Sequence, residues 1–259
     1  MSSSASRGKI ELTLEEISYT LRHSALPTII IEGKDDTIVF RPLEERFGAE
    51  RISIFPVGGR TKLLALFEEL GTNPQFLFIA DRDQWCVDPI PEKYMSSRML
   101  FTDGYSIEND AMRDGDMLAL LRYSERAKFE QELDIFLNWY ALAFNRVLQG
   151  NDEAIRTHCA TIIDEVEQRN SLMQLKPGEQ YPEELKEKLA AEYLRLVRGK
   201  SLIHLLVRQI SYPGRVPRHH HAALLEQVAV KPGPLLAKFY QAVEELLLGS
   251  ILTLPESAS

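Results

Sequence analysis

The segment TIIIEGKDD, residues 28–36, places a run of β-favouring residues directly before a cluster of acids. A short Thr and Ile run without alternating polar residues is typical of a strand that is buried on both faces. A second apolar run, FLFIA at residues 76–80, also ends at acids, Asp81-Arg82-Asp83. The two stretches predict buried strands that are each followed by carboxylates.

Further strand and helix signals alternate around these two stretches. Thr13 and Glu16 form a capping box for a first helix, and Pro27 ends it. Arg51–Val57 predicts a strand followed by a helix over Thr61–Leu70, and Arg98–Phe101 predicts a shorter strand. Strands that alternate with helices favour an α/β layer with a parallel sheet. We therefore expect a mostly parallel four-stranded sheet flanked by helices.

The second half of the chain carries a different pattern. From about residue 110 strand signals stop, and apolar residues recur at helical spacing, up to a final helix over Pro234–Leu248. An all-helical half is therefore expected. The predicted division is an N-terminal helix within residues 1–26, an α/β domain over 27–118 and a helical domain over 119–259.

Charge is distributed unevenly along the 259 residues. Lys and Arg total 30 against 38 Asp and Glu, and the net charge of -8 argues against a protein that coats DNA generally. Residues 193–225 nevertheless contain no acid. This stretch predicts a surface for the phosphate backbone of nucleic acid. Its candidate residues are Arg195, Arg198, Arg208, Arg215 and Arg218.

Other classes of site find little support. Cys86 and Cys159 are too few for a disulfide framework or a four-thiolate zinc site, and both are interpreted as apolar filler. Gly58-Gly59 is interpreted as a tight turn, with phosphate binding by its amides as the alternative. His219-His220-His221 is interpreted as part of a basic surface loop, since adjacent histidines on a helix face different ways. No apolar run is long enough to cross a membrane, and a cytoplasmic protein without membrane contact is expected.

Acids follow three of the four predicted strands, and in an open α/β sheet ligands gather at the carboxyl ends of the strands. Carboxylates held close together repel unless a cation or protons join them, and several oxygen ligands favour Mg²⁺ or Mn²⁺ over zinc. The alternative is that acids at strand ends are ordinary solvated loop residues. The candidate metal ligands and catalytic acids are Glu32, Asp36, Asp81, Asp83 and Glu108.

The combination of Glu32-Gly33 after one strand with Asp81-Arg82-Asp83 after another resembles the Toprim fold, which topoisomerases, bacterial primases and overcoming-lysogenization-defect (OLD) nucleases share. Asp36 stands four residues after Glu32, as in the OLD-like branch. With YSIEN at residues 105–109 and RGKSL at 198–202, the chain further resembles the AriB-type effectors of PARIS anti-phage systems.

The resemblance implies a metal-dependent endonuclease of bacterial defence. Such an effector is held by a partner ABC-type ATPase, is released as a homodimer and cleaves host tRNA. Lys200 would then stabilise charge on the scissile phosphate, and the alternative is a lysine at a helix end that interacts with the helix dipole. A related DNA nuclease of the OLD-like branch remains open. So does a non-catalytic Toprim scaffold that docks a partner, with the apolar end around Leu246–Leu254 as a candidate interface.

Asp83 and Asp110 are expected to differ in role. Asp83 lies two residues after Asp81 at the predicted carboxyl edge, where it would share the ion. Asp110 lies near the start of the next helix, where its charge would favour the helix dipole. Asp83→Asn is expected to abolish activity, and Asp110→Asn to cost at most about 1 kcal/mol of stability.

Overall fold

The β-branched run at residues 28–31 forms the central strand β1 (Thr28–Ile31) of a four-stranded sheet. The structure is a computed structural model that describes residues 12–48, 51–151 and 154–252. The strand order is β2-β1-β3-β4, and all four strands run parallel. The other strands are β2 (Ser53–Pro56), β3 (Phe76–Ala80) and β4 (Met99–Phe101). The predicted parallel four-stranded sheet flanked by helices is therefore confirmed.

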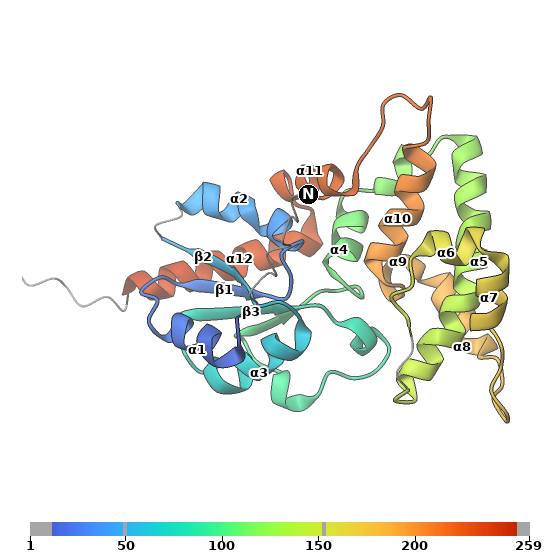
Figure 1. The fold of residues 1–259 in the computed structure, drawn as a ribbon. Helices are drawn as coiled ribbons and strands as arrows, with labels where there is room; N and C mark the ends of the chain where they lie inside the picture. Colours follow the sequence, from blue (N-terminus) through green and yellow to red (C-terminus); the bar gives the residue numbers. More distant parts are fainter. Residues whose placement is uncertain (1–11, 49–50, 152–153, 253–259) are drawn as a thin grey trace, which may run out of the picture. The chain divides into compact units, whose positions relative to one another are not determined.

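The sheet belongs to the first of two compact units, which comprises Met1–Ala80, Ser96–Leu100 and Gln241–Ser259. Every residue of β1 and β3 is buried, as their uninterrupted apolar character predicts. Figure 1 shows α2 on one side of the sheet and α1 and α3 on the other. These helices are α1 (Leu14–Arg22), α2 (Thr37–Phe47) and α3 (Arg60–Leu70).

The capping box predicted for the first helix is present. The backbone N–H of Thr13 donates to Glu16 Oε2 at 2.8 Å, and the N–H of Glu16 donates to Thr13 Oγ1 at 3.2 Å. These bonds satisfy two of the N–H groups that a helix start leaves without partners. The predicted helix within residues 1–26 is therefore confirmed from Leu14 on, and residues 1–11 lie outside the described part.

The second unit comprises Asp81–Met95 and Phe101–Tyr240. Among the described residues no strand follows Phe101, so the predicted helical half is confirmed. Its α-helices are α4 (Ile107–Asp114), α5 (Tyr123–Leu148), α6 (Cys159–Asp164), α7 (Val166–Leu172), α8 (Glu183–Ala191), α9 (Tyr193–Leu196), α10 (Gly199–Ile210) and α11 (His221–Val230). Short 3₁₀ turns lie at Asp83–Cys86, Glu92–Tyr94 and Met117–Leu120.

The division into units differs from the predicted boundary at residue 118. Residues 81–95 and 101–118 belong with the helices that follow them, whereas residues 96–100 belong with the sheet. The last helix, α12 (Pro234–Leu252), begins in the second unit and continues into the first. Leu246 is buried and Leu248 is 62% exposed, and the residues from 253 on lie outside the described part.

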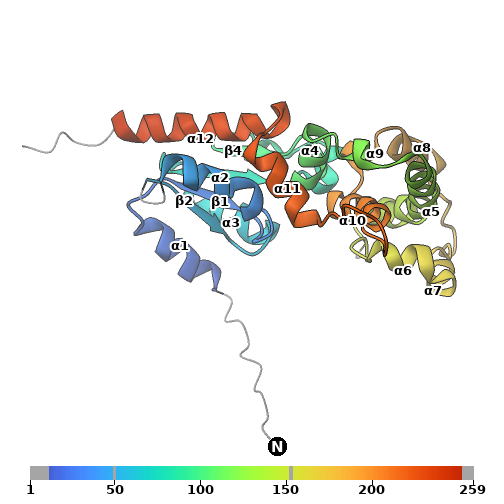
Figure 2. The same cartoon turned by 90° about the horizontal axis from the view of Figure 1, so that it is seen from above.

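Helix α5 is the centre of the second unit, and α8 and α10 pack against it (Figures 1 and 2). Phe136, Tyr140 and Phe144 lie one helical turn apart, and their rings stack with centroids 5.5 Å apart. Burial of these rings contributes to the unit's hydrophobic stabilisation. No helix of the described residues combines the length and the apolar character that crossing a membrane requires.

Candidate active site at the start of α4

Strands β1 and β3 end at the same edge of the sheet. Ile31, the last residue of β1, pairs in register with Ile79, and Ala80 closes β3. Glu32 follows Ile31 in the chain, and Asp81 follows Ala80. In the structure, as predicted, the adjacent parallel strands β1 and β3 are each followed directly by an acid.

In the first unit, Glu32 is fixed by the turn after β2. The N–H groups of Gly58 and Gly59 donate to its carbonyl oxygen at 2.9 and 2.8 Å. Both glycines have positive φ, at 89° and 131°, which glycine adopts without strain. The tight-turn interpretation of Gly58-Gly59 is thus confirmed, and its amides are bonded within the fold instead of being held for a phosphate.

The side chains of Glu32 and Asp36 are also engaged within this unit. Glu32 Oε1 lies 3.9 Å from the guanidinium of Arg60, and the Glu32 side chain is 14% exposed. Asp36, immediately before α2, accepts a hydrogen bond from the N–H of Gly33 at 2.8 Å. Both acids are therefore held in position at the carboxyl end of β1.

In the second unit, Asp81 and Asp83 are held by the segment that leads into α4. Asp81 Oδ1 accepts a hydrogen bond at 2.9 Å from the N–H of Ile107, the first residue of that helix. A carboxylate at a helix N-terminus is stabilised in its charged form by the helix dipole. The N–H of Asp83 donates to the carbonyl of Tyr105 at 2.8 Å.

Asp83 also adopts an uncommon backbone conformation. Its φ of 47° lies in the left-handed region, which few residues other than glycine adopt without cost. Aspartate enters this region more often than most residues, and Asp116 shares it with a φ of 41°. The hydrogen bond from the Asp83 N–H to Tyr105 holds the backbone here.

Glu108 is the second residue of α4 and is only 8% exposed. Its Oε2 accepts a hydrogen bond at 2.6 Å from the hydroxyl of Ser106. No ion pair to Glu108 occurs in the described part of the chain. Its place in the first turn of α4 gives this carboxylate a favourable interaction with the helix dipole, in addition to the Ser106 hydrogen bond. A cation bound at Glu108 stays a prediction.

The start of α10 docks on the start of α4 through Asn109, which is fully buried. Its Nδ2 donates to the carbonyls of Leu194 and Val197 at 2.9 and 2.8 Å, and its Oδ1 accepts from the N–H of Ser106 at 3.0 Å. A Cβ on Gly199 would lie 2.5 Å from Asn109 Oδ1 and 2.5 Å from Ser106 Oγ. Only glycine fits this contact.

This docking brings together the YSIEN segment at residues 105–109 and the RGKSL segment at residues 198–202. Its hydrogen bonds join residues that are 85 and 88 positions apart in the sequence. Lys200 follows Gly199 as the second residue of α10, and its charge acts on His204 one turn later. Ser106 and Asn109 belong to the YSIEN segment, but the sequence reasoning assigned them no role. The serine before α4 with Asn109 three residues later is a capping box, and that signal identifies both positions.

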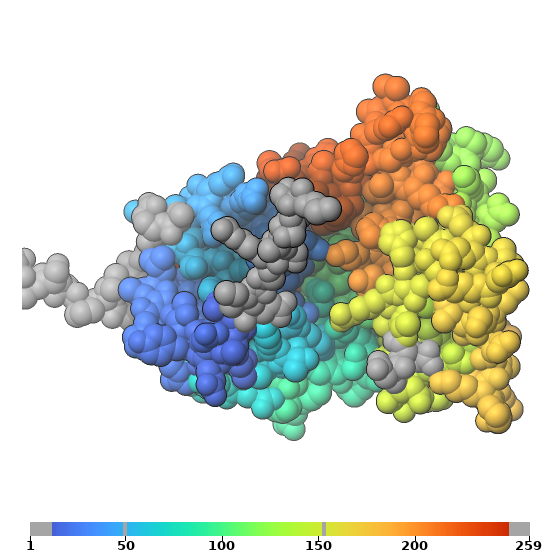
Figure 3. Space-filling view, in the orientation of Figure 1, coloured from blue at the N-terminus to red at the C-terminus, as the bar shows by residue number. Residues whose placement is uncertain are grey.

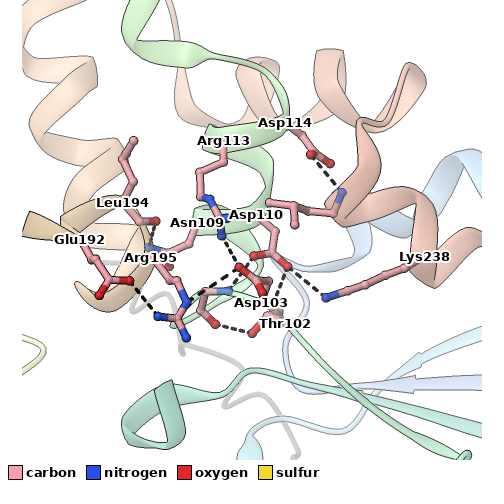
Figure 4. Close-up of polar contacts among 12 residues, drawn as sticks. Thr102, Asp103, Asn109, Asp110, Arg113, Asp114, Glu192, Leu194, Arg195 and Lys238 are labelled. Carbon is pink, nitrogen blue, oxygen red and sulfur yellow. Dashed lines mark hydrogen bonds and ion pairs between the residues drawn. The ribbon is translucent and has the colours of Figure 1, made fainter. Parts of the chain in front are cut away.

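Asp110 also belongs to α4, but it serves the fold (Figure 4). It is fully buried, and its two oxygens accept from the N–H groups of Asp103 and Gly104, both at 2.8 Å. Lys238 lies 3.8 Å away. Burial raises the pKa of Asp110, while the two N–H donors and Lys238 lower it. The expected position near a helix start is confirmed, but its contacts are with the loop before the helix.

A second acid of this loop is paired with an arginine of α4. Asp103 binds Arg113, and Arg195 lies 3.9 Å from the same carboxylate (Figure 4). Burial alone would raise the pKa of Asp103, but the hydrogen bond and charge of Arg113 outweigh it, so this pKa lies below its usual value. Charged side chains thus join α4 and α9 to the loop before α4 that carries Asp103.

The predicted phosphate-binding arginines have different surroundings. Arg215 is buried against Glu125, and Arg208 pairs with Glu132 at 2.9 Å and with Asp164 at 2.5 Å, so both have structural roles. Arg195 pairs with Glu192 as well as Asp103. Arg198 donates to Ser201 Oγ at 3.3 Å, and Arg218 is exposed. Arg198 and Arg218 have no ion pair within the described residues.

The cysteines and histidines support no separate site. Burial raises the pKa of Cys86 to about 12 and that of Cys159 to about 11, as expected for unreactive filler. His204 lies between His158 and His221, with ring centroids 4.9 and 5.9 Å away. Burial and then these two neighbours lower the pKa of His204 to about 4.

The oxygen ligands around α4 agree in kind with Mg²⁺ or Mn²⁺. Among the described residues, no three or more His, Cys, Asp or Glu side chains lie close enough together to hold a metal ion. Glu32 and Asp36 belong to the first unit, and Asp81, Asp83 and Glu108 belong to the second. A shared ion for these acids therefore stays a prediction. Comparison with protein-family models and with curated proteins finds no match.

Proposed function

We propose that this chain is a Mg²⁺- or Mn²⁺-dependent phosphodiesterase that cleaves nucleic acid. The observation that carries the proposal is the site at the start of α4. It combines Glu108, buried without an ion pair among the described residues, with Asp81 on a helix N-terminus and Asp83 in a left-handed conformation. The register of β1 and β3, which places Glu32 and Asp81 after the same sheet edge, supports a contribution from Glu32.

In this proposal the metal ligands are Glu32, Asp81 and Asp83, assisted by Asp36 and Glu108. When bound, the ion would supply Lewis-acid stabilisation of the attacked phosphate and lower the pKa of a water. The N–H of Ile107 orients Asp81, and the hydroxyl of Ser106 orients Glu108. Lys200, the residue after Gly199, would offset negative charge on the phosphate oxygens.

The resemblance to Toprim nucleases of the OLD-like branch supports a finer proposal. The chain would act as an effector of bacterial anti-phage defence, controlled by an ABC-type ATPase, and would cleave host tRNA as a homodimer. Co-purification with an ATPase encoded beside it, followed by sequencing of tRNA after release, tests this proposal. Intact tRNA together with cleaved DNA would favour the OLD-like DNA nuclease instead.

The decisive experiment compares Glu108→Gln with Glu92→Gln. The amide oxygen of the substituted side chain would still accept the Ser106 hydrogen bond, so folding is retained while the charge is lost. Glu92 is an exposed acid of the same unit. With Mg²⁺ or Mn²⁺ and RNA or DNA as substrate, Glu108→Gln is expected to cut the cleavage rate at least about 100-fold. Glu92→Gln is expected to resemble the wild type.

A calorimetric titration with Mn²⁺ provides a second readout. Wild-type protein is expected to bind the ion, and Glu32→Ala and Asp81→Asn are expected to bind it more weakly. Cleavage that is equal in the wild type and Glu32→Ala would remove Glu32 from the mechanism. If the wild type binds no ion even with nucleic acid present, the scaffold alternative is favoured.

A further inference from the structure

Three apolar side chains are unusually exposed where the loop between α10 and α11 meets the start of α5. Tyr123 is 94% exposed, Val216 76% and Tyr212 43%. The loop, coloured orange, projects beside the first turns of α5, coloured green (Figures 1 and 3). Clustered exposed apolar side chains mark interaction surfaces more often than isolated ones do.

This loop is fastened to α5 by a buried network. Arg215 and Glu125 are each 5% exposed, and Arg215 Nε lies 3.2 Å from Glu125 Oε1. Arg215 Nη2 also donates to the carbonyl of Leu120 at 3.0 Å, and the hydroxyl of Tyr212 lies 3.3 Å from Glu125 Oε1. The loop that carries Tyr212 and Val216 is therefore fixed against α5, which lowers the entropy cost of ordering this loop on binding.

The surroundings of the exposed rings carry positive charge. Arg122 donates to the carbonyl of Val216 at 2.8 Å, and its charge also acts on the buried Glu125. Arg126 donates to the carbonyl of Leu118 at 2.8 Å. Arg218 is exposed and lacks an ion pair in the described ranges. We call these six residues the tyrosine–arginine surface: Arg122, Tyr123, Arg126, Tyr212, Val216 and Arg218.

We propose that the tyrosine–arginine surface binds unpaired nucleotides of a single-stranded nucleic-acid segment. Exposed tyrosine rings offer faces on which bases stack, and the surrounding guanidinium groups complement the phosphates. A duplex hides its base faces, so the exposed rings would find no stacking partner on it. The proposal rests on the proposed function for the choice of nucleic acid as ligand, and the surface lies outside the site at α4.

The test measures binding without cleavage. Full-length protein is titrated, in EDTA, into a fluorescein-labelled single strand of RNA or DNA of about 20 nucleotides and into the matching duplexes, and anisotropy is read. Tyr123→Ala is expected to weaken single-strand binding about tenfold, and Tyr123→Phe to restore it, because stacking needs only the ring. The matched control is Tyr19→Ala, at a tyrosine of α1 that is 66% exposed.

Salt dependence tests the arginines. Arg218→Ala is expected to reduce the slope of log Kd against log salt by about 0.7, as loss of one single-strand phosphate contact predicts. RNA and DNA strands report which sugar the surface prefers, and preference for either supports the proposal. Duplex affinity equal to single-strand affinity would overturn it.

Other outcomes separate this inference from the proposed function. Cleavage in Mg²⁺ or Mn²⁺ together with unchanged binding by Tyr123→Ala overturns the tyrosine–arginine surface and leaves the nuclease intact. Single-strand binding that depends on Tyr123, without cleavage by the metal-loaded protein, supports the tyrosine–arginine surface and overturns the proposed nuclease function. A concentration-dependent dimer in light scattering that Tyr123→Ala abolishes, without strand binding, would assign the surface to a second copy of this chain and overturn the proposal.

Discussion

Asn109 provides a sharp test of how the second unit is held together, because its side chain joins α4 to α9 and to the residue that follows α9. The hydroxyl of Ser106 has one proton and lies 2.6 Å from Glu108 Oε2 and 3.0 Å from Asn109 Oδ1. The shorter contact, to a carboxylate, takes that proton. Asn109 therefore keeps three firm hydrogen bonds, one from the N–H of Ser106 and two to the carbonyls of Leu194 and Val197.

Asn109→Asp preserves the shape of the side chain and its acceptor for Ser106, but replaces the donating amide by an oxygen. The carbonyls of Val197, which is buried, and of Leu194, which is half-buried, then lose their donor. Each orphaned group costs about 1–3 kcal/mol. A carboxylate facing two carbonyls adds desolvation, which protonation partly relieves. We expect a loss of about 3–5 kcal/mol in the free energy of unfolding at pH 7, and a smaller loss at pH 5.

The assay is urea unfolding followed by circular dichroism, with Asn170→Asp as the matched control. Asn170 is an exposed residue of α7, so the same chemical change there is expected to alter stability by less than about 0.5 kcal/mol. If the two variants lose equal stability, the bonds from Asn109 to Leu194 and Val197 do not hold α4 and α9 together, and the assigned docking is refuted.

Three further variants test single features. Asp83→Asn is expected to lower the rate of metal-dependent cleavage at least about 100-fold in initial-rate assays. Asp110→Asn is expected to keep that rate but to lose about 1–3 kcal/mol of unfolding free energy in urea, because one buried N–H loses its acceptor. This loss is larger than the sequence alone suggested. Arg146→Met is expected to cost about 3–5 kcal/mol, because the buried Arg146 pairs with Glu179 and donates to the carbonyls of Leu172 and Gln174. A loss under about 1 kcal/mol would contradict that role. His204 has a pKa near 4 in the folded protein, below its usual 6.5. Its contribution to the free energy of unfolding is therefore fully present above pH 6.5 and is lost as the pH falls from 6.5 to 4. Since His204 is half-exposed, about 1 kcal/mol is expected, and His204→Gln should flatten the pH dependence of urea midpoints.

The sheet could be predicted from the sequence because its signals are local. Thr28–Ile31 and Phe76–Ala80 are apolar runs whose bounds match β1 and β3 residue for residue. The strand predicted over Arg51–Val57 is shorter, since β2 covers only Ser53–Pro56. Strand ends depend on which backbone groups find partners in a neighbouring strand, and a single sequence does not contain that information.

Helix α5 shows what a local pattern cannot delimit. Its middle is buried on nearly every side, so the polar face that marks an amphipathic helix is missing. Charged residues add to the difficulty, because Glu125, Glu132 and Arg146 are buried with partners on distant segments. Arg208 and Arg215 looked like free phosphate ligands for the same reason, since their acids lie 44 to 90 residues away in the sequence.

The acids near α4 differ in how much of their hydrogen-bonding capacity the fold uses, and composition hides that difference. Asp110 accepts from two N–H groups with Lys238 nearby, so its place in the fold already has a structural reason. Glu108, two residues earlier, accepts one hydroxyl and has no ion pair in the described chain, although it is almost as deeply buried. A fold that only needed a cap at this helix could use the Ser106–Asn109 box alone. Glu108 therefore has spare hydrogen-bonding capacity that Asp110 lacks, which is why the metal proposal rests on Glu108 more than on the number of acids in the sequence.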